Sequence, residues 1–207
     1  MIDAPTHRPT VEDRRRQIRD AAAACFRRSG FHGASMAEIA KEANLSVGQI
    51  YRYFENKEAI IEAIVEQDMA EKRAKFAEFY NAPGDITRHL IDGCPGAVAR
   101  FWDAERAALM LEVLAEAARN PKIAAVLRRR DAEERAMKAP FREAIRRPHW
   151  SDEEADLRSE LIGMMFEGMA VRSMSNPDID PEKLGPVLRS VMAAILELPE
   201  KEEAPDA

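Results

Sequence analysis

The stretch that decides the fold runs from Ser35 to Lys57 and reads SMAEIAKEANLSVGQIYRYFENK. Ser35 and Glu38 have the spacing of a capping box, so a helix is predicted to start at Ser35. Ser46 and Gln49 repeat that spacing, and they predict the start of a second helix. Two short helices separated by so short a turn are typical of a helix-turn-helix.

The exposed face of the second helix is predicted to carry polar groups. At about 100° per residue, Ile50 and Phe54 point toward the core. Gly48, Gln49 and Arg52 then point the opposite way. A bare backbone, an amide and a guanidinium suit base edges in the major groove, where Gln pairs with adenine and Arg with guanine. We therefore expect this face to read DNA.

The flanks of the same helix are predicted to contact the DNA backbone. The hydroxyl groups of Tyr51 and Tyr53 suit phosphates. Lys57 lies in the first turn of the following helix, where free amides, the helix dipole and an ammonium group attract an anion. The full set of predicted DNA-binding residues is Ser35, Ser46, Val47, Gly48, Gln49, Tyr51, Arg52, Tyr53 and Lys57.

The distribution of charge agrees with DNA binding at one end of the chain. The 207 residues carry a net charge of −6, but residues 1–57 hold ten Lys/Arg and seven Asp/Glu, a net of +3 that leaves −9 for the rest. A locally basic segment attracts phosphates even in an acidic protein. Cys25 and Cys94 match no metal spacing. We therefore expect no metal or cofactor. No secretory signal and no run of about 20 apolar residues is visible, so we expect a cytoplasmic protein.

Residues from about Ile18 to Val65 resemble the DNA-binding head of the TetR/AcrR family of bacterial regulators. The resemblance is carried by AAAACFRRSGF, SMAEIAKEA and SVGQIYRYFENKEAI. It implies a three-helix head, a connecting fourth helix, a helical body that binds a ligand and dimerises, and repression that a small molecule releases. The chain departs from the family at Val47, where many members carry a basic or polar residue. Val47 leaves an apolar contact instead, such as one to a thymine methyl group.

The rest of the chain is predicted to be helical, which makes the fold class all-α. A first helix from Val11 is expected to stop at Gly30. Further helices are predicted at 57–79, 85–91, 97–103, 105–119, 121–147, 151–175 and 180–198. Breaks are predicted at 93–96 and at Pro140, which must bend or interrupt its helix. The predicted organisation is a disordered arm (1–10), a helix-turn-helix domain (11–56), a helical effector-binding and dimerisation domain (57–198) and a disordered tail (199–207).

The last two predicted helices are the candidates for a dimer interface. Apolar residues recur along 184–198 at helical spacing, and residues 161–171 are apolar on nearly all faces. The predicted interface residues are Leu161, Met165, Leu184, Leu188, Val191 and Ile195. Packing inside a single monomer is the alternative. A homodimer would place two recognition helices about 34 Å apart and read a palindrome.

The middle helices are predicted to hold a pocket for a small-molecule effector. The candidate residues are Phe76, Trp102, Met110, Met137 and Phe141, because methionines and aromatic rings suit adaptable apolar sites. Ordinary core packing is the alternative for each of them. Glu112 and Glu116 are expected to be either counter-charges in this pocket or part of a surface run of ion pairs.

The predicted function is a ligand-responsive, DNA-binding transcriptional regulator. It is expected to be a repressor whose homodimer binds a palindromic operator in double-stranded DNA and leaves it when a small-molecule effector binds. The alternatives are a helical protein-interaction module without sequence-specific DNA binding, and an activator with the same head. An enzyme is not expected, since the four histidines are scattered and no HExxH, GxSxG, P-loop or CxxC motif occurs.

Overall fold

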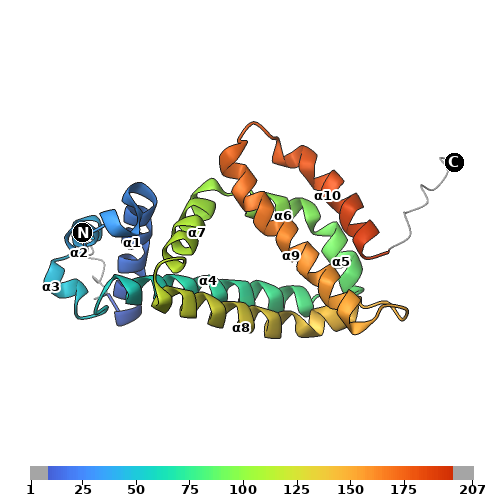
Figure 1. Ribbon diagram of the computed structural model, residues 1–207, viewed down its shortest axis with the longest axis horizontal. Helices are drawn as coiled ribbons and strands as arrows, with labels where there is room; N and C mark the ends of the chain where they lie inside the picture. The colour runs from blue at the N-terminus through green and yellow to red at the C-terminus, as the bar shows by residue number, and fades with distance from the viewer. Residues whose placement is uncertain (1–8, 198–207) are drawn as a thin grey trace, which may run out of the picture. The chain divides into compact units, whose positions relative to one another are not determined.

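The computed structural model describes residues 9–197, and every regular element in that range is a helix (Figure 1). The helices are α1 (Val11–Gly33), α2 (Met36–Glu42), α3 (Val47–Ile50), α4 (Lys57–Tyr80), α5 (Ile86–Asp92), α6 (Cys94–Phe101), α7 (Ala104–Ala117), α8 (Pro121–Ile145), α9 (Asp152–Ser175) and α10 (Pro181–Ile195). The all-α prediction is confirmed. The predicted disorder of residues 1–8 and 199–207 concerns positions outside the described residues, whereas Thr10, which also belongs to the predicted disordered arm, caps α1 through a capping box with Asp13. None of the described helices has the length and apolar character that a membrane span requires.

The helices group into two compact units. Within the described range, unit 1 comprises residues 9–71 together with Ala108–Ala132, and unit 2 comprises Lys72–Ala107 together with 133–197. Unit 1 therefore contains α1, α2, α3, the first part of α4, and parts of α7 and α8. This division differs from the predicted boundary after residue 56. The reason is that residues of α7 and α8 pack into the same core as the N-terminal helices.

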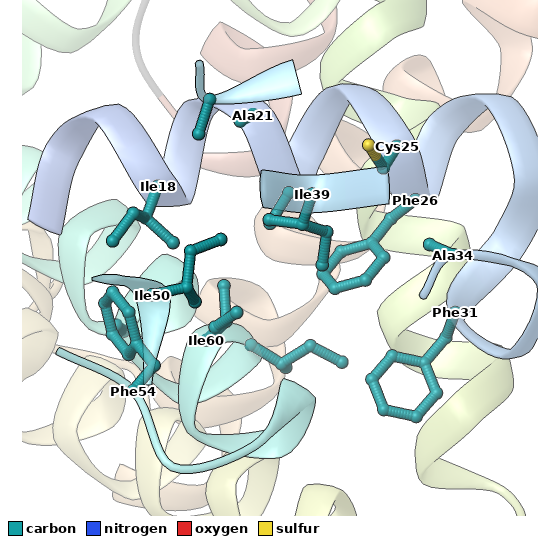
Figure 2. Close-up of a cluster of buried hydrophobic side chains, with 14 of the residues drawn as sticks. Ile18, Ala21, Cys25, Phe26, Phe31, Ala34, Ile39, Ile50, Phe54 and Ile60 are labelled. Atoms are coloured by element: carbon teal, nitrogen blue, oxygen red, sulfur yellow. The ribbon is translucent and has the colours of Figure 1, made fainter. Parts of the chain in front are cut away.

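Unit 1 is built around an apolar core to which each of its helices contributes. Figure 2 shows the part of this core that comes from α1, α2, α3 and α4. Ile18 and Phe26 of α1, Ile39 of α2, Ile50 of α3 and Ile60 of α4 are almost completely buried. Burying a side chain of this size stabilises the fold by roughly 1.5–3 kcal/mol. Since α3 is only four residues long, its position depends on this packing and not on its own helical stability.

Helices α1, α2 and α3 begin at capping boxes, as predicted for α2 and α3. The Ser35 side chain accepts a hydrogen bond from the Glu38 N–H at 3.1 Å, and Glu38 accepts one from the Ser35 N–H at 2.7 Å. Hydrogen bonds from Ser35 to the Glu38 carboxylate lower the pKa of that carboxyl group. The first helix kinks at Gly30, whose φ of 71° lies in the left-handed region, and then completes one more turn to Gly33. The predicted stop at Gly30 is therefore a kink within α1.

Pro95 and Pro140, both in unit 2, lie inside helices. The predicted break at 93–96 is confined to Gly93, because α5 ends at Asp92 and α6 already begins at Cys94, with Pro95 in its first turn. A proline there costs no helical hydrogen bond, since the first N–H groups of a helix have no partner within it. Pro140 does not interrupt α8, which continues to Ile145. The short α6 packs against both α9 and α10.

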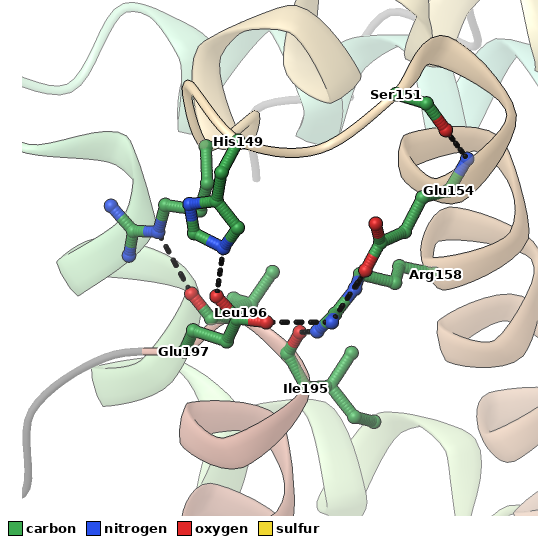
Figure 3. Close-up of polar contacts among 8 residues, drawn as sticks. His149, Ser151, Glu154, Arg158, Ile195, Leu196 and Glu197 are labelled. Atoms are coloured by element: carbon green, nitrogen blue, oxygen red, sulfur yellow. Dashed lines mark hydrogen bonds and ion pairs between the residues drawn. The ribbon is translucent and has the colours of Figure 1, made fainter.

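The C-terminal end of α10 is tied to neighbouring segments of unit 2 by two arginines (Figure 3). The Arg147 side chain donates to the Leu196 carbonyl at 2.9 Å. The guanidinium of Arg158, on α9, donates to the Ile195 carbonyl and lies 2.7 Å from the Glu197 carboxylate. Positive groups at a helix C-terminus also interact favourably with the helix dipole. The contacts fix the end of α10 to α9 and to the segment before it.

Candidate nucleic-acid interface

The turn that leads into α3 is held by α1. Asn44 has a φ of 51°, a left-handed conformation that asparagine tolerates better than most residues. Gln17 of α1 donates from its side-chain nitrogen to the Ala43 carbonyl at 2.6 Å. Ser46 then caps α3 through its bond to the Gln49 N–H. The start of α3 is therefore set by local capping and by a contact from a distant helix.

The far end of α3 is also fixed by α1. Regular helix ends at Ile50, and the next turn is closed by bonds from the Tyr53 and Phe54 N–H groups to the Ile50 carbonyl, at 2.8 and 3.0 Å. Arg15 donates to the Tyr53 carbonyl at 2.9 Å, and its guanidinium carbon lies 4.4 Å from the centre of the Phe54 ring. The two bonds from α1 hold both ends of α3, which gives its exposed side chains a defined orientation.

The exposed side of α3 carries the groups that the helical wheel predicted. Ile50 and Phe54 are buried. The exposed residues of α3 and of the turn that follows it are Val47, Gly48, Gln49, Tyr51 and Arg52. We call this set the outer face of α3. Tyr53 is half-buried and packs against the core of unit 1, so less of it is available to a partner than predicted. Contact of these residues with DNA remains a prediction.

Two features of the outer face have no explanation within the protein itself. The Arg52 side chain is exposed and has no hydrogen bond or ion pair within residues 9–197. A Cβ atom added at Gly48 would meet nothing within 4 Å, so packing inside the described chain does not require a glycine there. A guanidinium without a partner and a bare backbone position are what a major-groove surface needs.

Gly48→Ala is therefore expected to separate stability from binding. Alanine in place of a helical glycine stabilises a helix by about 0.5–1 kcal/mol, and the added methyl group has room in the free protein. On DNA the same methyl group would keep the backbone away from the bases. Thermal unfolding should show an equal or higher melting temperature, while a duplex-binding titration should show weaker affinity. Unchanged affinity would mean that the backbone at Gly48 does not approach DNA.

Lys57 does not fit its predicted role as a phosphate ligand. Its ammonium group donates to the Phe31 carbonyl at 2.5 Å and to the Ala34 carbonyl at 2.8 Å. It also lies 4.5 Å from the centre of the Phe31 ring. The prediction is corrected: the charge is used to join the start of α4 to the end of α1. The hydroxyl oxygens of Ser35 and Ser46 cap α2 and α3, and their contact with phosphate stays a prediction.

The same peptide segment is held from the other side by Glu112 of α7. Its carboxylate accepts a hydrogen bond from the Phe31 N–H at 2.5 Å. A Cβ atom at Gly30 would lie only 3.1 Å from that carboxylate, so both this approach and the positive φ favour glycine. Phe31 thus has its N–H held by α7 and its C=O held by Lys57. Glu112 therefore binds a backbone N–H and forms no ion pair within residues 9–197, while its role as a pocket counter-charge stays a prediction.

Glu116 lies one turn further along α7 and, unlike the half-buried Glu112, is fully buried. Its carboxylate is 2% exposed and lies 3.0 Å from the His32 ring nitrogen and 3.6 Å from Arg119. The Asn120 side chain donates to its other oxygen at 3.0 Å. The pairing with Arg119 follows the helical spacing, but the expected surface location is wrong. Only spacing within α7 was visible in the sequence, and that spacing does not show that α7 meets the end of α1.

The five predicted pocket residues do not form one cluster within a unit. Phe76 and Phe141 lie in unit 2 with ring centres 5.7 Å apart, and Phe141 is buried in the core. Trp102 and Met137 are half-buried in the same unit. Met110 belongs to unit 1, where its sulfur accepts a bond from Arg130 at 3.4 Å. Contact of these residues with an effector stays a prediction.

The predicted dimer residues divide into exposed and buried positions. Leu161 is 47% exposed and Val191 is 40% exposed, as an interface in a free monomer requires. Leu188 is only 5% exposed and packs in the core of unit 2, so its assignment to the interface is corrected. Met165, Leu184 and Ile195 are half-buried against that core. The exposed apolar residues on α9 and α10 are Leu157, Leu161, Met164, Val171, Met174, Val187 and Val191.

Both the N-terminal and the C-terminal part of the chain match models of known protein families. Residues 18–64 match the model of the bacterial regulatory proteins of the tetR family. Residues 101–197 match the model of the C-terminal region of BetI-type transcriptional repressors. The two matches do not overlap, and together they span more than half of the chain.

Individual relatives are also transcriptional regulators. The regulator UidR of Escherichia coli K12 is 35% identical over 116 residues, so the chain spans little more than half (57%) of that relative's length. The repressor Rv1474c of Mycobacterium tuberculosis is 26% identical over 181 residues, which cover 84% of this chain and 89% of the relative. The crystal structure of a transcriptional regulator from Pseudomonas aeruginosa PAO1 shares the fold, with a TM-score of 0.76, 23% identity, and coverage of 92% of this chain and 93% of that chain.

Proposed function

Because the chain belongs to the TetR family of bacterial transcriptional regulators, we propose that it is a homodimeric repressor that binds an operator, a palindromic site in double-stranded DNA. A small-molecule effector releases it from that site. Each subunit reads one half of the operator with the outer face of α3. The palindrome follows from the two-fold symmetry of a dimer, which presents the same helix twice.

The outer face of α3 is the observation that carries this proposal. It combines an exposed guanidinium, an exposed amide and a glycine that no contact in the described chain requires. Arg15 and Gln17 hold the two ends of the helix, so these groups are preorganised for a groove. A rigid presentation of this kind lowers the entropy that binding costs.

Dimerisation is supported by an apolar stripe on α9. Leu157, Leu161, Met164 and Val171 are exposed and follow one another at helical spacing. Gly168 lies on the same stripe, and a Cβ atom there would meet nothing within 4 Å. A contiguous exposed apolar surface of this kind marks an interaction site, and the open glycine allows another helix to approach closely. A second copy of the chain is the partner that a palindrome-reading protein needs.

Control by an effector is proposed to involve α7. Glu112 of this helix binds the Phe31 N–H, and Lys57, at the start of the helix that follows the outer face of α3, binds the Phe31 carbonyl. A shift of α7 would therefore move Phe31 and, through the bond from Lys57, the start of α4. The proposal of a repressor and not an activator is supported by the BetI-type model and by Rv1474c, both of which are named repressors.

Salt dependence and one substitution test DNA binding. Affinity for duplex DNA should fall by at least about tenfold between 50 and 200 mM salt, because phosphate contacts release counterions. Arg52→Ala should cost about 1–3 kcal/mol in operator binding and relax the choice of base at one position per half-site. Fluorescence anisotropy with labelled duplexes measures both. A folded protein that shows no preference among duplexes would support the alternative of a protein-interaction module, whereas a base choice that is unchanged in Arg52→Ala would remove Arg52 from the contacts with bases.

A further inference from the structure

The side-chain amide of Gln49 has a defined orientation in α3. The Ser46 N–H donates to the Gln49 side-chain oxygen at 2.8 Å, and the Gln49 N–H donates to the Ser46 hydroxyl oxygen at 3.2 Å. A backbone N–H only donates, so the amide atom that faces Ser46 must be the oxygen and not the nitrogen. The NH₂ group is consequently the free end of the amide, and it has no hydrogen-bond partner within residues 9–197.

This orientation changes the base edge that Gln49 matches. A glutamine with a free amide offers one donor and one acceptor, which suit N7 and the N6 amino group of adenine. In the capping box the oxygen is turned toward the Ser46 N–H, so the end of the amide that is free to meet a base carries the two donors of the NH₂ group. Guanine places two acceptors, O6 and N7, side by side in the major groove, whereas adenine pairs its N7 acceptor with a donor.

The capping box matters for a helix as short as α3. The helix spans only Val47–Ile50, and its N-terminal cap is the pair formed by Ser46 and Gln49. The bond from the Ser46 N–H to the Gln49 side-chain oxygen is the reciprocal half of this box, and turning that oxygen away leaves the Ser46 N–H without its partner. A bidentate contact with adenine would have to compensate for turning the oxygen away from Ser46. A donor contact with guanine leaves the cap in place, so it requires no rearrangement of the free protein.

We propose that Gln49 acts as a hydrogen-bond donor toward DNA and selects guanine over adenine at its position in each half-site. This reverses the adenine preference expected from the sequence, and it rests on the proposed DNA-binding function. Arg52 lies one helical turn further on the same exposed side and is also a donor without an acceptor. Gln49 and Arg52, the two predicted base readers on the outer face of α3, then both favour guanine edges.

Gln49→Glu separates the capping role from the reading role. Glutamate is a regular capping-box partner and can still accept from the Ser46 N–H, but it has no N–H to donate. In a selection from random duplexes, one position in each half-site should change between the two proteins. Wild type should prefer guanine over adenine there by about tenfold or more, and Gln49→Glu should prefer cytosine, whose N4 amino group is a donor. Circular dichroism and thermal unfolding should agree between the two proteins.

Gln49→Lys is the matched control, since lysine keeps donors and removes the acceptor. It should retain guanine at the position that changes in Gln49→Glu. An adenine preference in wild type, or a guanine preference that persists in Gln49→Glu, would overturn the role of Gln49. If wild type enriches an inverted repeat in which no position responds to Gln49→Glu, the inference fails and the proposed function stands. If folded wild type enriches no duplex, the proposed function fails with it.

Discussion

Leu161→Lys is expected to give a folded monomer that no longer holds the operator. Leu161 is 47% exposed in the free subunit, so a lysine there disturbs the packing of unit 2 very little. At a helix–helix interface the same lysine would place an unpaired charge in an apolar contact, which is strongly unfavourable. Without the second half-site, affinity should fall by about 10²–10⁴-fold, the usual gain from linking two binding modules. Light scattering and operator titration measure the two effects.

Ala77→Lys is the control for this variant. Ala77 is exposed on α4 in the same unit, so a lysine at this position introduces the same charge on a different helix of unit 2. It should remain dimeric and bind the operator as wild type does. A Leu161→Lys protein that stays dimeric at micromolar concentration, with unchanged operator affinity, would exclude the exposed face of α9 as the interface.

Lys57→Met should destabilise unit 1 by about 2–4 kcal/mol, since hydrogen bonds to charged groups are worth about 1.5–3 kcal/mol each. Methionine keeps much of the apolar stem but removes the donor to the Phe31 and Ala34 carbonyls. Those two carbonyls would be left without the ammonium, and the contact with the Phe31 ring would lose its charge. Urea unfolding of the full-length protein measures the loss.

The salt dependence of DNA binding distinguishes this structural role from a phosphate contact. Lys57→Met should leave the slope of log affinity against log salt unchanged, whereas loss of one phosphate contact lowers it by about 0.9. Lys41→Met is the matched control, because Lys41 is exposed on α2 and its side chain has no hydrogen bond or ion pair within residues 9–197. Its stability should stay within about 0.5 kcal/mol of wild type. Unchanged stability in Lys57→Met together with a lower slope would restore the phosphate assignment.

The helix-turn-helix was predictable because its signals are local. The capping boxes at Ser35 and Ser46 involve residues three positions apart, and both are present in the structure. The inward direction of Ile50 and Phe54 follows from helical geometry, and both are buried. Local spacing also suggested that Gln49 has two roles, as a cap and as a base reader. Only the hydrogen bond to the Ser46 N–H shows that these roles compete for the same oxygen atom.

The missed features depend on contacts between distant parts of the chain. Glu112 lies 81 positions after Phe31, and no periodicity within α7 indicates that the two meet. Lys57 had the position of a phosphate ligand, but the end of α1 supplies carbonyl groups that bind it instead. Leu188 sits on an apolar stripe in the sequence, yet packing against the core of unit 2 decides which edge of that stripe stays exposed.

The most direct test of the central claim is to select duplexes from a random pool with the full-length protein and to sequence those that bind. A homodimer that reads DNA with the outer face of α3 should enrich an inverted repeat, with half-site centres about one helical turn of DNA apart or a multiple of it. Arg52→Ala should lose the preference at one position in each half. Enrichment of single, unrepeated sites, or of no sequence at all by a folded protein, would contradict the account.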